Sequence, residues 1–108
     1  ADLGFTECVN LGNYEVDTWV KWADVLKEMH DYPRALEVLQ HGLEFHPESS
    51  VINFRLGGIY LLSSQSLEAR FYLKNAYMSD AKQLNHFYET FPEFRSSSFV
   101  KQSLSLKV

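Results

Sequence analysis

The feature that most constrains this fold is an internal similarity at a spacing of 34 residues. Shifting the sequence by that length aligns small residues at Ala1, Ala35 and Ala69 without any gap. Large residues four positions later and small residues three positions beyond them keep the same offset. These further sets are Phe5, Leu39 and Leu73, and Cys8, Gly42 and Ala76. The recurrence predicts an array of similar units whose faces are buried against their neighbours.

Each unit is expected to be helical, because its apolar residues recur with helical spacing. Trp19, Trp22 and Leu26 follow the i, i+3, i+7 spacing of one amphipathic stripe. The second unit repeats this rhythm with Ile52, Leu56, Ile59 and Tyr60. Ala35 and Gly42 lie about two turns apart on one helix face, where small side chains allow another helix to approach closely. No segment alternates with a period of two, so no sheet is expected.

Capping residues and prolines locate the ends of these helices. Asp31 is placed to cap a helix that has Pro33 in its first turn, and Ser66 is placed to cap a later helix. The expected helices span residues 1–11, 17–29, 33–45, 50–62, 67–79, 83–91 and 98–106. In the last of them, Phe99 and Leu104 are expected to turn inward.

The aligned positions resemble the tetratricopeptide repeat (TPR), a helix–turn–helix unit of 34 residues with the pattern W-x₂-L-G-x₂-Y…A-x₃-F…P. Residues 16–49 match it through Trp19, Trp22, Ala23, Leu26, Ala35, Leu39, Gly42 and Pro47. Residues 50–83 match it through Leu56, Gly57, Tyr60, Ala69, Leu73 and Ala76. The second unit departs from the pattern, because Asn53 replaces the aromatic residue and Ala81 replaces the proline.

The resemblance implies an all-α fold, a right-handed TPR-like superhelix (solenoid) of antiparallel helix pairs that forms one domain over residues 1–108. Residues 1–15 resemble half of a preceding repeat, and residues 84–108 resemble a partial repeat followed by a C-terminal capping helix. The chain is therefore expected to be the C-terminal part of a longer, bacterial-type array. Its two full units, together with the half-repeat and the cap, lie near the minimum of roughly three that independent stability requires.

Composition and charge exclude several classes of partner. Ten Lys and Arg residues stand against 14 Asp and Glu, for a net charge of −4, which argues against binding to nucleic acid. The longest strongly apolar stretch, Gly57–Leu62, is well below the roughly 20 residues of a membrane helix, so no membrane insertion is expected. Cys8 is the only cysteine. It is expected to be a buried thiol and gives no sign of secretion, so a cytoplasmic location is favoured.

The residue patterns of catalysis and of metal binding are missing from the sequence. His41 and His46 are five residues apart, whereas a helical metal-binding pair is spaced by four. Gly57 and Gly58 lie inside an expected helix and are not followed by the lysine of a phosphate-binding loop. We therefore expect no enzymatic activity, no metal and no cofactor.

The resemblance also implies a binding surface, because TPR arrays use the inner face of each first helix as a concave groove for a partner peptide. The groove residues are expected to be Asp17, Val20, Asp24, Lys27 and Glu28, then Val51, Phe54, Gly58 and Leu61, and finally Asn85 and Tyr88. Val20, Phe54 and Tyr88 share the 34-residue offset and would form an apolar stripe. A protein or peptide partner with an apolar anchor and some basic character would fit such a surface.

Several alternatives remain open from the sequence. Phe54 and Tyr88 would leave no open groove if they packed on each other or against the terminal cap. The leading function is a non-catalytic protein–protein interaction scaffold. The rivals are a regulatory or structural segment of a larger protein whose catalytic domain lies outside this chain, and a self-association module. In the latter, the exposed flank of the N-terminal helix 1–11 would pair with a second copy as a homodimer.

Overall fold

The computed structural model describes residues 15–104, and this part of the chain contains helices and no strand. The α-helices are α2 (Val16–Glu28), α3 (Tyr32–Phe45), α4 (Ser50–Leu62), α5 (Ser66–Ser79), α6 (Leu84–Thr90) and α7 (Ser98–Ser103). Two short 3-10 helices, η2 (Ala81–Gln83) and η3 (Pro92–Phe94), flank α6. The all-α prediction is confirmed for these residues. The expected helix 1–11, with Ala1, Phe5 and Cys8, lies outside them.

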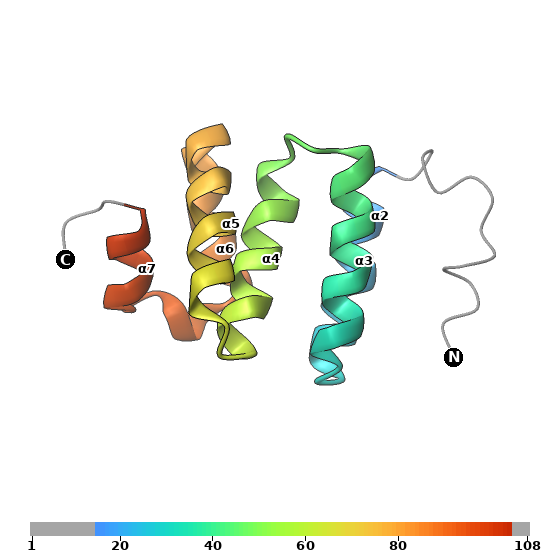
Figure 1. Cartoon of the computed structure of the whole chain (residues 1–108), viewed down its shortest axis with the longest axis horizontal. Coiled ribbons are helices and arrows are strands. Elements are labelled where there is room, and N and C mark those ends of the chain that lie inside the picture. The colour runs from blue at the N-terminus through green and yellow to red at the C-terminus, as the bar shows by residue number, and fades with distance from the viewer. Residues whose placement is uncertain (1–14, 105–108) are drawn as a thin grey trace.

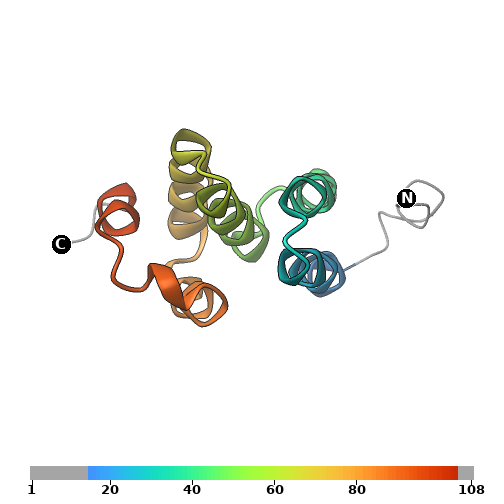
Figure 2. The ribbon, with the colours of Figure 1, turned by 90° about the horizontal axis from the view of Figure 1, so that it is seen from below.

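Helices that follow one another along the chain run up and down side by side (Figure 1). The contacts join α2 to α3, α3 to α4, and α4 to α5. In the view from below, α2 and α6 lie on one side of the molecule and α3 and α5 on the other, with α4 between them (Figure 2). The short helix α7 packs on α5 at the C-terminal end.

The central position of α4 follows from its composition. All residues from 52 to 59 are buried, including the polar Asn53 and Arg55. A helix that is apolar on nearly every side is stable only when other elements cover it all round. Here α2, α3, α5 and α6 supply that cover.

The 34-residue similarity is present in the backbone of the two loops that close the helix hairpins α2–α3 and α4–α5. His30 and Ser64 both adopt a left-handed conformation, with φ of 61° and 62°. Two hydrogen bonds that close each loop are also related by the same offset. In the first loop, the backbone N–H of His30 donates to the carbonyl of Lys27, and that of Asp31 donates to the carbonyl of Leu26. In the second loop, Ser64 donates to Leu61 and Gln65 donates to Tyr60 in the same way. The two hairpins therefore turn in the same way.

Small residues lie where helices approach most closely, as expected. A Cβ added to Gly42 would lie 2.9 Å from Cγ of Trp19, and one added to Gly57 would lie 2.6 Å from Leu73. Ala35 and Ala69 are both fully buried. Any larger side chain at these four positions would push two helices apart.

Local details differ from the sequence expectations in several places. Ser66 is the first residue of α5 rather than its cap. Asp31 occupies the N-cap position of α3 but makes no capping hydrogen bond, and its carboxylate lies 3.5 Å from Nε of Arg34. Leu104 is buried as expected, whereas Phe99 is only half-buried, beneath an arginine.

Candidate functional site

A cleft of about 710 Å³ lies where α2, α4 and α6 meet. Its lining residues are Val16, Asp17, Val20, Lys21 and Asp24 from α2, Val51 and Arg55 from α4, and Gln83 and His86 from η2 and α6. Four residues expected to line the groove therefore come together here, namely Asp17, Val20, Asp24 and Val51. This cleft is the part of the predicted groove that remains open.

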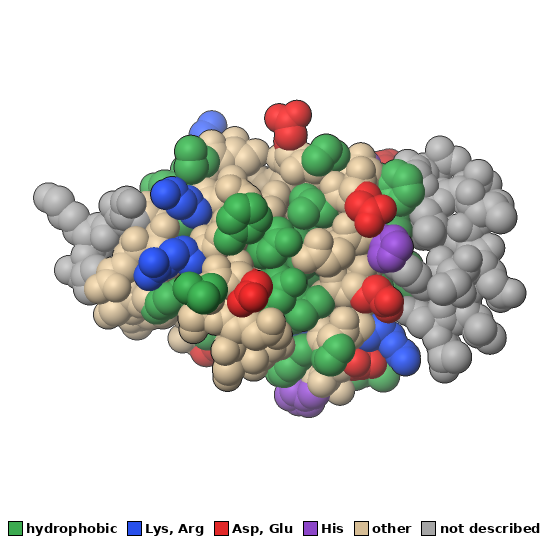
Figure 3. Space-filling view, viewed as in Figure 1, with side chains coloured by type: hydrophobic (Ala, Val, Ile, Leu, Met, Phe, Trp, Pro, Cys, Tyr) green, Lys and Arg blue, Asp and Glu red, His purple; other side chains and the backbone are tan. Residues whose placement is uncertain are grey.

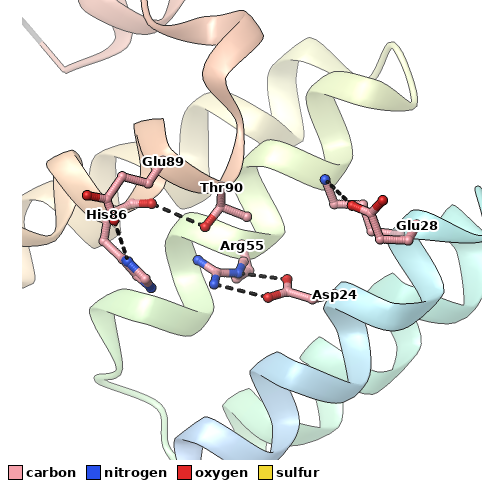
Figure 4. A network of polar contacts seen from close by, with 7 residues as sticks. Asp24, Glu28, Arg55, His86, Glu89 and Thr90 are labelled. Atoms are coloured by element: carbon pink, nitrogen blue, oxygen red, sulfur yellow. Dashed lines mark hydrogen bonds and ion pairs between the residues drawn. The ribbon is translucent and has the colours of Figure 1, made fainter.

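An ion pair between Arg55 and Asp24 joins α4 to α2 beside this cleft (Figure 4). Nε of Arg55 donates to Oδ1 of Asp24 at 2.9 Å, and Nη2 donates to Oδ2 at 3.2 Å. The arginine side chain is only 5% exposed, whereas that of the aspartate is 36% exposed. A buried guanidinium needs such a partner, because an unpaired charge of this kind is strongly destabilising.

The remaining nitrogen of the guanidinium, Nη1, is buried and has no hydrogen-bond partner within the described structure. In Figure 4 it lies on the side of Arg55 that faces away from Asp24 and toward His86. The other buried polar side chains of α4 differ in this respect. Ser50 donates to the carbonyl of Ala76 at 2.8 Å, and Asn53 donates to a backbone carbonyl of the preceding turn. Arg55 Nη1 is thus an unsatisfied donor at the cleft.

The polar side chains at the cleft rim already have partners within the chain. Lys21 Nζ lies 3.1 Å from Asp17 Oδ2, and both side chains are about three-quarters exposed. On the opposite wall, Nδ1 of His86 lies 3.4 Å from Oε1 of Glu89, again between exposed side chains. Exposed pairs of this kind contribute about 0–1 kcal/mol each. The negative charge of Asp17 is therefore balanced by the neighbouring Lys21.

The apolar stripe expected from Val20, Phe54 and Tyr88 is buried inside the molecule. Phe54 is 1% exposed, and its ring centroid lies 5.4 Å from that of Phe87 on α6. Tyr88 is also buried, and the guanidinium of Arg95 lies 5.4 Å from the centre of its ring. As anchors for a partner, Phe54 and Tyr88 are corrected to core residues, because α6 packs against α4, whereas the nearly buried Val20 still contributes to the cleft lining.

The other end of the expected groove is filled by the C-terminal part of the chain. A Cβ added to Gly58 would lie 2.5 Å from the ring of Phe91, which is fully buried. Nζ of Lys27 lies 5.1 Å from the centre of the same ring and 3.2 Å from Oε2 of Glu28. Phe91 therefore occupies the space beside Gly58. The last two expected groove residues, the half-buried Leu61 and the exposed Asn85, lie outside the open cleft.

Sequence reasoning missed a second hollow, on the opposite side of the molecule. It has a volume of about 540 Å³ and lies between α3 and α5. Two exposed hydrophobic residues of α5, Phe71 and Met78, line it. Figure 3 shows hydrophobic side chains gathered over the middle of this face. The seven-residue spacing of Phe71 and Met78, which places them on one helix face, was the signal available in the sequence.

Burial also changes the acidity of two tyrosines. The pKa of Tyr88 is raised because burial disfavours the phenolate, although the nearby Arg95 opposes this effect. The pKa of Tyr60 is raised by burial too, and a hydrogen bond from Gln40 partly offsets it. Neither phenol lines the cleft, so the raised pKa values reflect burial in the folded chain and not the chemistry of the cleft.

The described residues contain neither a metal-binding cluster nor a membrane-spanning helix. Between residues 15 and 104, no three His, Cys, Asp or Glu side chains are grouped so that they could hold a metal ion. None of the described helices has both the length and the apolar character needed to cross a bilayer. No protein family, curated protein or solved structure matches the chain.

Proposed function

We propose that this chain is a non-catalytic interaction scaffold of the TPR type, in which the cleft between α2, α4 and α6 binds a segment of a partner protein. The observation that carries the proposal is the cleft itself, which lies between helices of successive units and is lined by Asp17, Val20, Asp24 and Val51. The equal geometry of the two hairpin loops supports the superhelical arrangement of helix pairs.

The lining of the cleft favours a partner that is largely uncharged. Val16, Val20 and Val51 give it an apolar floor, and a volume of about 710 Å³ is in the range of a site for a small ligand or a few residues of peptide. Asp17 is paired with Lys21, and Asp24 with Arg55. Because both carboxylates of the cleft already have cationic partners, the bound segment does not need the basic character expected from the sequence.

A self-association role is the second candidate, and the exposed hydrophobic residues of α5 favour it. Leu67, Phe71 and Met78 are each more than half exposed. Exposed apolar surface of this kind marks interfaces in many proteins. Sedimentation velocity over a concentration series separates the two candidates, because a scaffold of the proposed kind remains monomeric without its partner.

Selection of peptides on the chain tests the scaffold proposal. Peptides from a random displayed library would be selected on the full chain, synthesised and measured by calorimetry. Val51→Lys places a charge on the half-buried floor of the cleft, and Leu67→Lys is the matched control on the exposed face of α5. We expect Val51→Lys to lose at least about tenfold in affinity while Leu67→Lys binds as the parent does. Equal binding to both variants would place the peptide elsewhere and contradict the proposal.

A further inference from the structure

We infer that Arg55 is the polar anchor of the cleft, and that its Nη1 donates a hydrogen bond to an uncharged carbonyl oxygen of the bound partner segment. This inference rests on the proposed function, because it assigns the chemical group that the same cleft recognises. Arg55 was not among the groove residues expected from the sequence. In this inference it holds the partner segment in the cleft through a hydrogen bond.

The guanidinium of Arg55 has hydrogen-bonding capacity that the described chain does not use. Arginine presents its five N–H donors in a fixed planar fork. Asp24 accepts from Nε and Nη2, and no described group accepts from Nη1. Buried polar groups in folded proteins are nearly always satisfied. A side chain that is 5% exposed, lines a cleft and keeps a donor unused therefore points to an acceptor brought by a ligand.

The charges around Arg55 select the kind of acceptor. Asp24 already neutralises the guanidinium, and Asp17 lies on the same cleft wall. A second carboxylate at Nη1 would find the charge of the guanidinium already compensated by Asp24 and would be repelled by that carboxylate. A carbonyl oxygen of a peptide group accepts the same hydrogen bond without adding charge. The cleft therefore favours a main-chain or side-chain amide over an acidic group.

Access to Nη1 requires one side chain to turn aside. Gln83 and His86 line the cleft beside Arg55, and Figure 4 shows His86 reaching toward the guanidinium from α6. The His86 side chain is half exposed, and its Nδ1 lies 3.4 Å from Oε1 of Glu89. Rotation of such a side chain disturbs no core packing. Binding is therefore expected to displace the His86 ring and expose Nη1.

The apolar floor specifies what lies next to the carbonyl. Val16, Val20 and Val51 line the cleft together with Arg55. A partner residue with an aliphatic side chain can place that side chain on the valines while its carbonyl oxygen accepts from Nη1. The smallest probe with these properties is N-acetyl-leucine N-methylamide. N-acetyl-leucinate is its matched control, because it replaces the terminal amide by a carboxylate.

Titration of the isotopically labelled full chain with the two probes, followed by NMR, tests the anchor. We expect the amide probe to shift the Nε–H signal of Arg55 and the backbone amides of Val51 and His86 in a saturable manner. The leucinate is expected to bind several-fold more weakly. Arg55→Lys keeps a cation beside Asp24 but lacks Nη1, and is expected to lose about tenfold in affinity for the amide probe. Arg34→Lys is the control, because Arg34 pairs with Asp31 outside the cleft.

A second variant keeps the inference testable if Arg55→Lys folds poorly. His86→Ala removes the exposed side chain that lines the cleft beside Arg55, and it is expected to strengthen binding of the amide probe. Equal affinities for the two probes, or an Arg55 signal that does not move while the Val51 amide shifts, would overturn the inference. So would an absence of saturable shifts, which would mean that Nη1 is satisfied by an internal water. If peptides selected on the chain still depended on Val51, the scaffold proposal would survive that failure.

Discussion

His30 and Ser64 hold the same left-handed backbone conformation, 34 residues apart, in the loops that close the two helix hairpins. Glycine is the usual residue at such a position, because a side chain there costs roughly 1–2 kcal/mol. Neither residue is glycine, so each hairpin contains a strained residue at its turn. The two strained residues occupy equivalent positions, since the hydrogen bonds that close the two loops are also equivalent.

Ser64→Gly is therefore expected to stabilise the protein by about 0.5–1 kcal/mol, because glycine adopts positive φ without strain. Urea denaturation followed by circular dichroism measures the change. Ser63→Gly is the matched control, since Ser63 has a φ of −92° and gains nothing from glycine. Equal effects of the two substitutions would contradict the assignment of strain to Ser64.

Trp19 and Trp22 are expected to differ in their contribution to stability. Their rings stack with centroids 5.9 Å apart, but Trp19 is fully buried and Trp22 only half-buried. Trp19→Ala is expected to cost about 3–5 kcal/mol, the usual penalty for removing a buried aromatic residue. Trp22→Ala is expected to cost clearly less. Thermal melts of the two variants decide this, and a larger loss for Trp22→Ala would contradict the described packing of α2.

Gly58 and Phe91 are expected to be energetically coupled. Because a Cβ at Gly58 would lie 2.5 Å from the Phe91 ring, Gly58→Ala is expected to destabilise the chain by about 1–3 kcal/mol. Phe91→Leu in the same chain should relieve part of that loss. A double-mutant cycle from urea denaturation measures the coupling, and strict additivity of the two substitutions would show that the residues do not touch.

The stability of the protein is expected to fall in alkali, because Tyr88, which is buried in the folded chain, ionises more readily once the chain is unfolded. The pKa of Tyr88 is raised in the folded state, so that state holds its phenolic proton to a higher pH than the unfolded state does. The stability contributed by neutral Tyr88 is therefore complete below the unfolded pKa of about 10 and is lost progressively above it.

Denaturation at a series of pH values from neutral to strongly alkaline measures this loss, and Tyr88→Phe should reduce its slope. Tyr32→Phe is the comparison, because Tyr32 lies at the start of α3 and is only half-buried. The same slope in Tyr88→Phe and in the parent chain would contradict the prediction.

The sequence predicts the helices well because their signals are local. The apolar spacing around Trp19 and Leu26, and the small residues Ala35 and Gly42, depend only on helix geometry and close packing. Helix boundaries agree to within one residue for the five helices from α2 to α6. The short 3-10 helix η2 was not expected, and it starts after Asp80, whose side chain accepts from the backbone N–H of Lys82.

The binding surface is harder to predict because it depends on which helix covers which face. The 34-residue offset placed Phe54 and Tyr88 correctly in phase with Val20, but it carries no information on how closely α6 approaches α4. That approach buries Phe54 against Phe87. It also brings His86 beside Arg55, a pairing of distant residues that no spacing along the chain predicts.

The all-round burial of α4 limits where the chain can be divided without exposing its interior. Because α4 has almost no polar face, any exchange of pieces that left it at an edge would turn interior surface outward. A break in the loop between Pro47 and Ser49 would separate α4 from α2 and α3 and would expose apolar surface on both fragments.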